Sequence, residues 1–259
     1  MKIAVCIKQV VTREWQLRVN DQKTWIRDQD ASFELNEPDA YALEEALRLK
    51  EKHTGEVIVC CAGPARSTQV IREALARGAD RAIHVESDAL ANADANAVAD
   101  ALAAAIKDEG VDLVLTGLQS DDQGFGQVGV VLAEKLGMPH ATIIMEVQAA
   151  DPSTGSGQGG LRVKRELEGG WFQWVALPMP ALLTIQSGIN QLRYATLKGI
   201  MAAKKKEIKK VAAPAAAPMQ RITSIYFPEK GKKTQMLSGS AADAAKELVK
   251  RLREEARAL

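Results

Sequence analysis

Short apolar runs alternate with longer amphipathic segments over the first 150 residues of the chain. The runs predict strands at residues 3–10, 56–62, 81–85, 111–117 and 141–148. The segments between them predict helices at residues 38–53, 67–77, 94–107 and 126–136. Strands that are apolar throughout and alternate with helices are typical of a parallel sheet covered on both faces. The pattern therefore predicts an α/β fold with a doubly wound, mostly parallel sheet.

The helix ends carry residues that commonly start or stop a helix. Asn36 and Pro38 form a favoured N-terminal pair, because asparagine caps the first turn and proline fits near the first helical position. Gly78 and Gly137 follow the second and fourth helices, where a glycine can adopt the left-handed backbone that closes a helix. These residues support the predicted helix boundaries.

The texture of the sequence changes after Asp151. The segment DPSTGSGQGG at residues 151–160 predicts a turn-rich linker, and runs at 161–167 and 171–177 predict two strands. Glu168, Gly169 and Gly170 between the two runs predict a hairpin connection. A further apolar run at residues 180–185 returns to the sheet, so the hairpin is an antiparallel extension of a parallel core.

Residues 201–259 predict an arm that extends from the α/β domain. Lysines followed by an Ala/Pro segment predict an extended connector at residues 202–218. Residues 240–259 begin with a serine and place Ala244, Leu248 and Leu252 at helical spacing, which predicts an amphipathic terminal helix. We therefore expect two parts, an α/β domain at residues 1–200 and an arm at residues 201–259 that docks elsewhere.

Composition adds an asymmetry of charge to this picture. The 259 residues are 46% hydrophobic and 26% charged, which is ordinary for a globular protein and excludes a disordered, collagenous or membrane-embedded chain. The net charge is only +1, but residues 1–190 carry −9 and residues 191–259 carry +10. The near-neutral total argues against nucleic acid as a partner, and the basic segment still requires an explanation.

The scarce residues restrict the chemistry. Cys6, Cys60 and Cys61 lie in apolar runs and read as small buried side chains in a reducing compartment. His84 and His140 read as hydrogen-bonded structural residues, and no metal-binding spacing of Cys and His occurs in the sequence. The N-terminus reads as a buried strand without a signal-peptide cleavage site, so we expect a cytoplasmic protein.

The candidate chemistry lies in loops at the carboxyl ends of the strands, where open α/β sheets bind ligands. The loop GLQSDDQGFGQVG at residues 117–129 contains a formal GxGxxG pattern at Gly124, Gly126 and Gly129. It follows the fourth strand instead of the first, so it does not match the dinucleotide motif. Its glycines and the helix behind it still suit a nucleotide, while Asp121 and Asp122 suit a ribose, a cap or a structural water. A glycine-rich loop that simply turns into a helix is the alternative.

The remaining loops predict binding and no reaction. Residues 10–36 form a long connection that contains Trp15 and Trp25 and predicts an inserted hairpin. No Ser-His-Asp, Cys-His or paired-carboxylate arrangement is evident in these loops, so we expect no catalytic residue.

One segment carries a specific resemblance. The chain has, in order, these residues of a family pattern: Arg165, Glu166, Gly169, Gly170, Pro180, Ala181, Thr184, Asn190, Arg193, Tyr194, Ala195, Thr196 and Leu197. At these positions the chain resembles the β subunit of electron transfer flavoproteins. The likeness extends upstream through Asn36 and residues 45–50 to the loop at 117–128. The chain departs from the family pattern at Leu192, where a proline is usual, in the aromatic stretch at residues 171–174 and at Phe125.

The resemblance implies a Rossmann-like fold of the adenine-nucleotide-binding type, and a heterodimer. In this family an α subunit carries the FAD that transfers electrons, while β holds AMP, or a second FAD in members that bifurcate electrons. The implied nucleotide contacts are Cys6, Asn36, Glu37, Pro38, Asp39, Ala62, Gly117, Leu118, Gln119, Ser120, Asp121, Asp122, Gln123, Gly124, Phe125, Gly126, Gln127 and Val128. Arg165 and Glu166 are implied to face the flavin domain. With a heterodimer implied, we expect the basic arm at residues 201–259 to dock on the α subunit, which would account for its charge. Arg193, Tyr194, Ala195, Thr196 and Leu197 are implied to recognise dehydrogenases.

The function that the resemblance implies is electron transport by a carrier, which is not itself an enzyme. The heterodimer would accept electrons from flavin dehydrogenases, such as the acyl-CoA dehydrogenases of fatty acid oxidation, and pass them to a membrane quinone reductase, the ETF:quinone oxidoreductase, or another acceptor. A bifurcating flavoprotein is the first alternative. A stand-alone adenine-nucleotide-dependent enzyme would need a phosphate-grasping SGGxDS-like or Walker loop, which the sequence lacks. A non-catalytic nucleotide sensor is the third alternative.

Overall fold

The computed structural model describes residues 1–149, 160–215, 218–228, 231 and 234–258. The chain divides into two units, Met1–Thr223 and Ser224–Leu259. The predicted linker at residues 151–160 lies outside the described residues except for Gly160.

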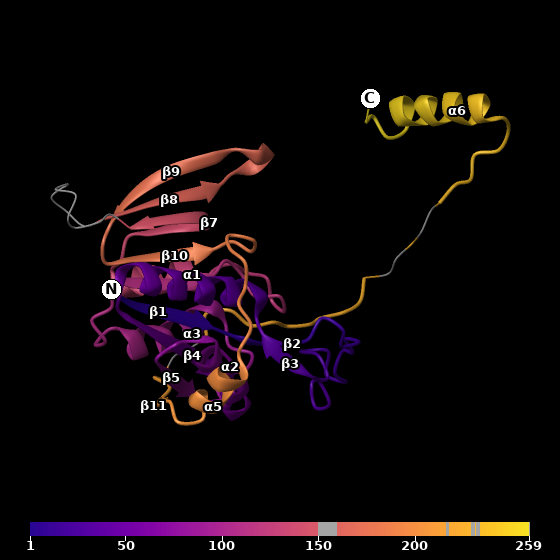
Figure 1. Cartoon of the computed structure of the whole chain (residues 1–259). Coiled ribbons are helices and arrows are strands. Elements are labelled where there is room, and N and C mark those ends of the chain that lie inside the picture. Colours follow the sequence, from indigo (N-terminus) through magenta and orange to yellow (C-terminus); the bar gives the residue numbers. More distant parts are fainter. Residues whose placement is uncertain (150–159, 216–217, 229–230, 232–233, 259) are drawn as a thin grey trace. The chain divides into compact units, whose positions relative to one another are not determined.

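A sheet of nine strands forms the first unit, in the order β11-β5-β4-β1-β6-β10-β7-β8-β9 (Figure 1). The strands are β1 (Lys2–Ile7), β4 (Glu56–Gly63), β5 (Arg81–Glu86), β6 (Leu113–Gly117), β7 (His140–Ala149), β8 (Gly160–Glu166), β9 (Phe172–Pro178), β10 (Ala181–Ile185) and β11 (Ile208–Ala212). Neighbours from β11 to β7 pair in parallel, whereas β7, β8 and β9 pair antiparallel. The prediction of a parallel core with an antiparallel hairpin extension is confirmed.

Helices cover both faces of the sheet, so the doubly wound prediction is also correct. The helices are α1 (Glu37–His53), α2 (Thr68–Arg77), α3 (Ala95–Ile106) and α4 (Val128–Leu136). Successive residues of β1 enter opposite cores, with Ile3 and Val5 in the layer below α1 and α2, and Ala4 in the layer below α3 and α4. This alternation explains why β1 is apolar at every position.

The predicted first strand is interrupted at Lys8. β1 ends at Ile7, and β2 (Gln9–Val11) pairs antiparallel with β3 (Phe33–Leu35) in a separate two-stranded sheet. The two short strands enclose the long connection, as expected for an inserted hairpin.

The expected connector at residues 202–218 is wrong over its central part. α5 (Leu197–Ala203) is followed by β11, which adds a parallel edge strand beside β5. Ile208 and Val211 pack against the two cores, while Lys209 and Lys210 pair with Glu109 and Glu86. The strand was not predicted because its lysines interrupt the apolar pattern. Charged side chains are nevertheless common on edge strands, since they discourage pairing with other chains.

The second unit contains one helix, α6 (Ala241–Glu254), among its described residues. Ser240 caps it by accepting a hydrogen bond from the Asp243 N–H at 3.2 Å, as the sequence predicted. Leu248 and Val249 are exposed on this helix. Among the helices of the described residues, none is long and apolar enough to cross a membrane.

Candidate functional site

A cleft opens at the carboxyl ends of β1, β4 and β6, where the strand order of the sheet reverses. β1 lies between β4 and β6, and the chain continues from β4 to one side and from β6 to the other. Adjacent loops diverge at such a switch point and leave room for a ligand. The cleft has a cavity volume of about 100 Å³ and is lined by the three strand ends, the loop at residues 117–129 and the start of α3.

The cleft brings together most of the residues implied as nucleotide contacts. Those that line it are Cys6, Asn36, Asp39, Ala62, Gly117, Leu118, Gln119, Ser120, Gln123, Phe125, Gly126, Gln127 and Val128. Glu37, Pro38, Asp121, Asp122 and Gly124 are not among its lining residues. The glycine loop, residues 117–128, therefore forms much of the wall, and nucleotide binding at these residues stays a prediction.

Sequence reasoning missed the opposite wall. Leu90, Ala91, Ala93, Ala95, Val98 and Leu102 line the cleft from the start of α3 and the turn before it. Small apolar side chains leave a smooth surface that suits the flat ring of a base. The Ala-rich pattern predicted the helix, but a period of 3.6 residues does not show which side of it faces a ligand.

Asn36 joins helix α1 to the glycine loop. It occupies the N-cap position as predicted, but its side chain makes no capping hydrogen bond. Instead, Asn36 Nδ2 donates to the Gln119 carbonyl at 3.1 Å, and Asn36 Oδ1 accepts from the Asp121 N–H at 2.9 Å. The buried amide thus sets the distance between α1 and the loop.

Asp39 joins two strand ends in the same way. Its Oδ1 accepts from the Gly117 N–H at 3.0 Å, and its Oδ2 accepts from the Lys8 N–H at 2.8 Å. The residue is only 6% exposed, and this burial raises the pKa of its carboxyl group to about 7 despite hydrogen bonds that favour the charged form. Asp39 therefore fixes the floor of the cleft and titrates near neutral pH.

This pKa predicts a pH dependence of stability. A carboxyl group whose pKa is raised by folding contributes stability that is complete below its unfolded pKa and is lost as the pH rises through the folded value. Wild type should therefore lose up to about 4 kcal/mol, relative to Asp39→Asn, between about pH 4 and pH 7. Urea unfolding of both proteins across this range measures the difference, and a difference that is constant with pH would contradict the assignment.

Ion pairs occupy the two acidic residues of the glycine loop. Lys8 Nζ donates to Asp122 Oδ1 at 2.7 Å and to Gln123 Oε1 at 3.2 Å. Arg13 pairs with Asp121 at 3.2 Å and also with Glu37. These contacts hold the loop to the segment after β1, and the ribose, cap or water role of the two carboxylates stays a prediction.

The loop ends in a helix N-terminus that faces the cleft. Gly126 has a φ of +62°, and α4 begins at Val128, where no side chain caps the first turn. Free N–H groups at such a position favour a phosphate. A Cβ atom at Gly129 would lie 2.6 Å from Thr184 Cγ2, so this glycine lets α4 approach the sheet closely. Backbone donors, a buried polar floor and an apolar wall together fit an adenine mononucleotide.

The three cysteines and His84 are buried, as predicted. All three cysteines are buried and free, and burial raises the pKa of Cys60 and of Cys61 to about 12. His84 is buried with Nε2 3.2 Å from the Gly63 carbonyl, whereas His140 is exposed. The described residues contain no group of His, Cys, Asp and Glu side chains that could hold a metal ion.

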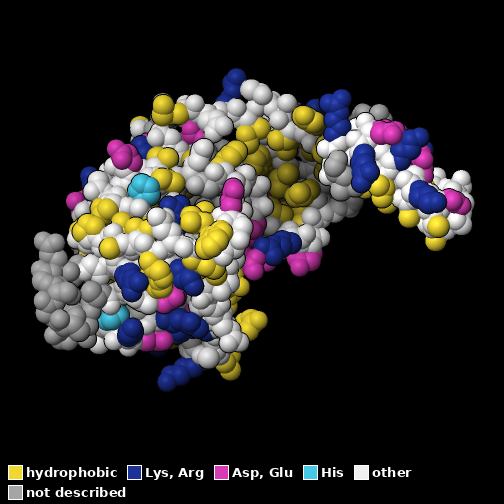
Figure 2. All heavy atoms as spheres, turned by 90° about the horizontal axis from the view of Figure 1, so that it is seen from above, with side chains coloured by type: hydrophobic (Ala, Val, Ile, Leu, Met, Phe, Trp, Pro, Cys, Tyr) yellow, Lys and Arg dark blue, Asp and Glu magenta, His cyan; other side chains and the backbone are white. Residues whose placement is uncertain are grey.

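The hairpin presents aromatic and cationic side chains together. Arg162 stacks over Trp174 at 4.4 Å from the ring centroid, and Lys164 lies over Phe172 at 4.2 Å. Figure 2 views the molecule from the side of β9 and shows hydrophobic side chains interspersed with Lys and Arg. Arg165 donates to Thr142 Oγ1 at 3.2 Å, and Glu166 accepts from Gln186 at 3.1 Å, so these two residues have local partners.

The turn at residues 190–197 projects side chains into solvent. Tyr194 is 89% exposed and Leu197 is 76% exposed. Thr196 Oγ1 accepts from the Gly199 N–H at 3.0 Å and so caps α5. A backbone held by a cap while its large apolar side chains stay exposed is the arrangement expected of a contact surface.

Comparisons with known proteins identify the family of the chain. The sequence model of the family described as "Electron transfer flavoprotein domain" matches residues 24–216. The chain is 36% identical to the electron transfer flavoprotein subunit beta of Methylophilus methylotrophus, over 98% of each chain. It is 33% identical to the subunit beta of Bacillus subtilis over the full length of both, and 37% identical to that of Bos taurus over 82% of each.

Proposed function

The chain belongs to the electron transfer flavoprotein family as a β-type subunit, and we propose that it pairs with an α subunit to form an FAD-containing electron carrier. Electrons would come from flavin dehydrogenases and pass to a quinone reductase or another acceptor. In the pair, the FAD of the α subunit supplies the redox chemistry, and this chain supplies a nucleotide site and a docking surface. The cytoplasmic location remains a prediction from the sequence.

The cleft at the switch point carries the proposal. Its loop leads into a helix N-terminus that no side chain caps, and its opposite wall is apolar. These properties match the phosphate and the base of AMP, respectively. We assign AMP a structural role, because it would join the glycine loop, α1 and α3 around one ligand.

A second hollow supports the alternative of a second FAD. It has a cavity volume of about 690 Å³ and shares Leu90, Ala93, Gln123 and Phe125 with the cleft. A ligand that extended past Phe125 could occupy both spaces, as a dinucleotide would require. A bifurcating flavoprotein is therefore the second candidate.

Coexpression with the α subunit from the same operon or genome tests the assignment to a carrier. A stable heterodimer with the absorption spectrum of a bound flavin is expected, together with reduction of that flavin by a dehydrogenase and its substrate. A chain that stays alone and binds adenine nucleotide without an α subunit would favour a nucleotide sensor and overturn the proposal.

A further inference from the structure

The segment from Asn190 to Lys206 is held at both ends and exposed in the middle. Its first residues contact α1, and its last residues contact α2. Between these attachments, Tyr194 and Leu197 face solvent. The contacts at each end are polar and directional, so they determine how the exposed middle is presented.

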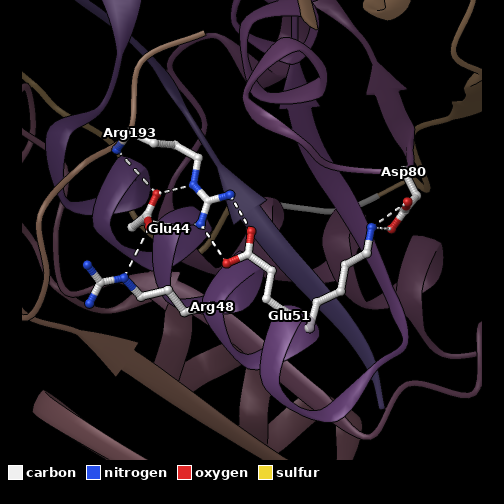
Figure 3. Close-up of polar contacts among 6 residues, drawn as sticks. Glu44, Arg48, Glu51, Asp80 and Arg193 are labelled. Atoms are coloured by element: carbon white, nitrogen blue, oxygen red, sulfur yellow. Dashed lines mark hydrogen bonds and ion pairs between the residues drawn. The ribbon is translucent and has the colours of Figure 1, made fainter. Parts of the chain in front are cut away.

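Arg193 makes the attachment to α1. Its Nε and Nη2 donate to the two carboxylate oxygens of Glu44 at 2.8 and 3.1 Å, and its Nη1 and Nη2 donate to Glu51 at 2.6 and 3.2 Å. Figure 3 shows the guanidinium reaching over α1 toward both carboxylates. Two bidentate pairs use the full planar fork of an arginine, which a lysine cannot reproduce.

Arg193, Glu44 and Glu51 form an ion-pair clamp, and the burial of Glu44 makes this clamp stronger than an ordinary surface ion pair. The side chain of Glu44 is only 5% exposed, whereas that of Glu51 is 59% exposed. Arg48 Nε also donates to Glu44 at 3.1 Å, from within the same helix. Removal of Arg193 would therefore leave a largely buried carboxylate with one of its two cationic partners, which is more costly than the loss of an exposed pair.

Asn190 adds a second contact with α1. Its Nδ2 donates to Glu45 Oε2 at 3.0 Å and to the Tyr41 carbonyl at 3.2 Å. Burial raises the pKa of Glu45, and the hydrogen bond from Asn190 acts against that shift. The turn thus meets α1 at two successive points before it reaches Tyr194.

The far end of the segment is attached to α2. Arg72 Nη1 donates to the carbonyls of Ala203 and Lys206 at 2.6 and 2.9 Å, and Lys206 Nζ donates to the Leu75 carbonyl at 3.0 Å. A Cβ atom at Gly199 would lie 2.3 Å from the Ala76 carbonyl oxygen, so α5 sits directly against the end of α2. This end is fixed by packing as well as by hydrogen bonds.

The backbone before Arg193 lacks a rigid residue. Leu192 stands directly before Arg193, and it packs partly buried against the core. A leucine leaves its φ free in the unfolded chain and in a loosened turn, whereas a proline would restrict it. The side-chain contacts of Arg193 and Asn190 must therefore order this end of the turn.

We propose that Arg193 is a positioning residue, which holds Tyr194 and Leu197 in the one conformation that an electron-donating flavoprotein dehydrogenase recognises. The proposal rests on the proposed function of the turn as a dehydrogenase contact. A turn that is already ordered binds without a further loss of conformational entropy, and a turn that samples many conformations binds in proportion to the competent fraction.

Variants that remove a contact with the dehydrogenase and variants that loosen the turn should differ in their binding kinetics. Leu197→Ala removes a contact that exists in the complex, so it should increase the dissociation rate. Arg193→Lys keeps the positive charge but loses the planar fork, so it should mainly decrease the association rate. The decrease is about ten-fold if the turn has the binding-competent conformation in one tenth of the molecules. Glu51→Gln weakens only the exposed half of the clamp and should give an intermediate decrease.

The experiment uses the purified heterodimer and an immobilised acyl-CoA dehydrogenase from the same organism. Association and dissociation rates are measured for each variant, and hydrogen exchange reports the backbone amides of residues 192–199. Arg66→Lys is the matched control, because it removes a guanidinium from an ion pair with Asp28 elsewhere on the surface. Bound nucleotide and the unfolding temperature of each variant check that the remainder of the protein is unchanged.

The expected result is slower association and faster amide exchange at residues 192–199 in Arg193→Lys, with Arg66→Lys like wild type. The positioning role would be overturned if Arg193→Lys and Glu51→Gln associated at the wild-type rate while Leu197→Ala bound more weakly. That result would leave the docking function intact. Unchanged binding by Leu197→Ala as well would overturn the docking function itself.

Discussion

Removal of Ser224–Leu259 is expected to weaken association with the α subunit by at least about 100-fold, which corresponds to roughly 2.7 kcal/mol. The described part of this unit exposes Tyr226, Phe227 and Met236, and its helix exposes Leu248 and Val249. Full burial of one such side chain contributes about 1.5–3 kcal/mol, so the burial of two exceeds the expected loss. An apolar stripe on an amphipathic helix needs a surface that covers it.

The position of the truncation follows from the structure. A cut after Thr223 keeps β11, and it also keeps the Met219 and Gln220 N–H groups that donate to Asp94 Oδ2 at 2.6 and 2.7 Å. The first unit should therefore keep its urea midpoint. Calorimetric titration with the α subunit measures the affinity, with Leu248→Ser as a point variant and Ala245→Ser as its matched control. A truncated chain that binds as tightly as the full chain would refute the account of the arm.

Replacement of Gly117 by alanine is expected to abolish nucleotide binding and to lower the free energy of unfolding. A Cβ atom there would lie 2.4 Å from Asp39 Oδ1 and 2.8 Å from the Asp39 nitrogen. Because α1 carries Asp39 on its first turn, the added methyl group would push this turn away from β6 and widen the floor of the cleft. Overpacking of a tight site commonly costs about 1–3 kcal/mol.

The test compares two Gly→Ala variants. Gly231→Ala adds a methyl group where no atom of the described residues beyond its chain neighbours lies within 4 Å, so it should leave both nucleotide content and stability close to wild type. Nucleotide released from each purified heterodimer by heat is quantified, and urea unfolding gives the stability. Full nucleotide content in Gly117→Ala would show that the contact between α1 and β6 does not shape the binding site.

The sheet could be predicted because its strands are apolar on both sides. Ile3, Val5 and Ala4 serve two cores at once, so β1 has no polar position that obscures the pattern. β11 was missed for the opposite reason, since an edge strand that pairs on one side tolerates Lys209 and Lys210. A local pattern therefore predicts a strand where apolar residues dominate the run, as in the largely exposed β9, and misses one where lysines interrupt the run, as in β11.

The cleft was predicted from one side only. The glycine loop is contiguous, so its composition marks it as a binding element, whereas Leu90 and Val98 reach the cleft only through the tertiary fold. The role of Asn36 also depended on contacts far away in sequence, because its amide bonds to Gln119 and Asp121 in place of its own helix. Such long-range partners cannot be inferred from the spacing of residues.

The contacts between turn and helix show the same limit. The resemblance marked Arg193 as part of a recognition segment, but its partners Glu44 and Glu51 lie 149 and 142 positions earlier in the chain. The order of the strands brings α1 beneath this segment. The two glutamates lie on one face of the helix, and only this arrangement places both of them within reach of Arg193.

The nucleotides bound to the heterodimer test the central claim most directly. The purified complex is denatured, and the FAD and AMP released from each αβ pair are counted by chromatography. We predict one FAD and one AMP, with the AMP absent from the Gly117→Ala complex. Two FAD per pair would establish the bifurcating alternative, and a complex without adenine nucleotide beyond the FAD of the α subunit would contradict the assignment of the cleft.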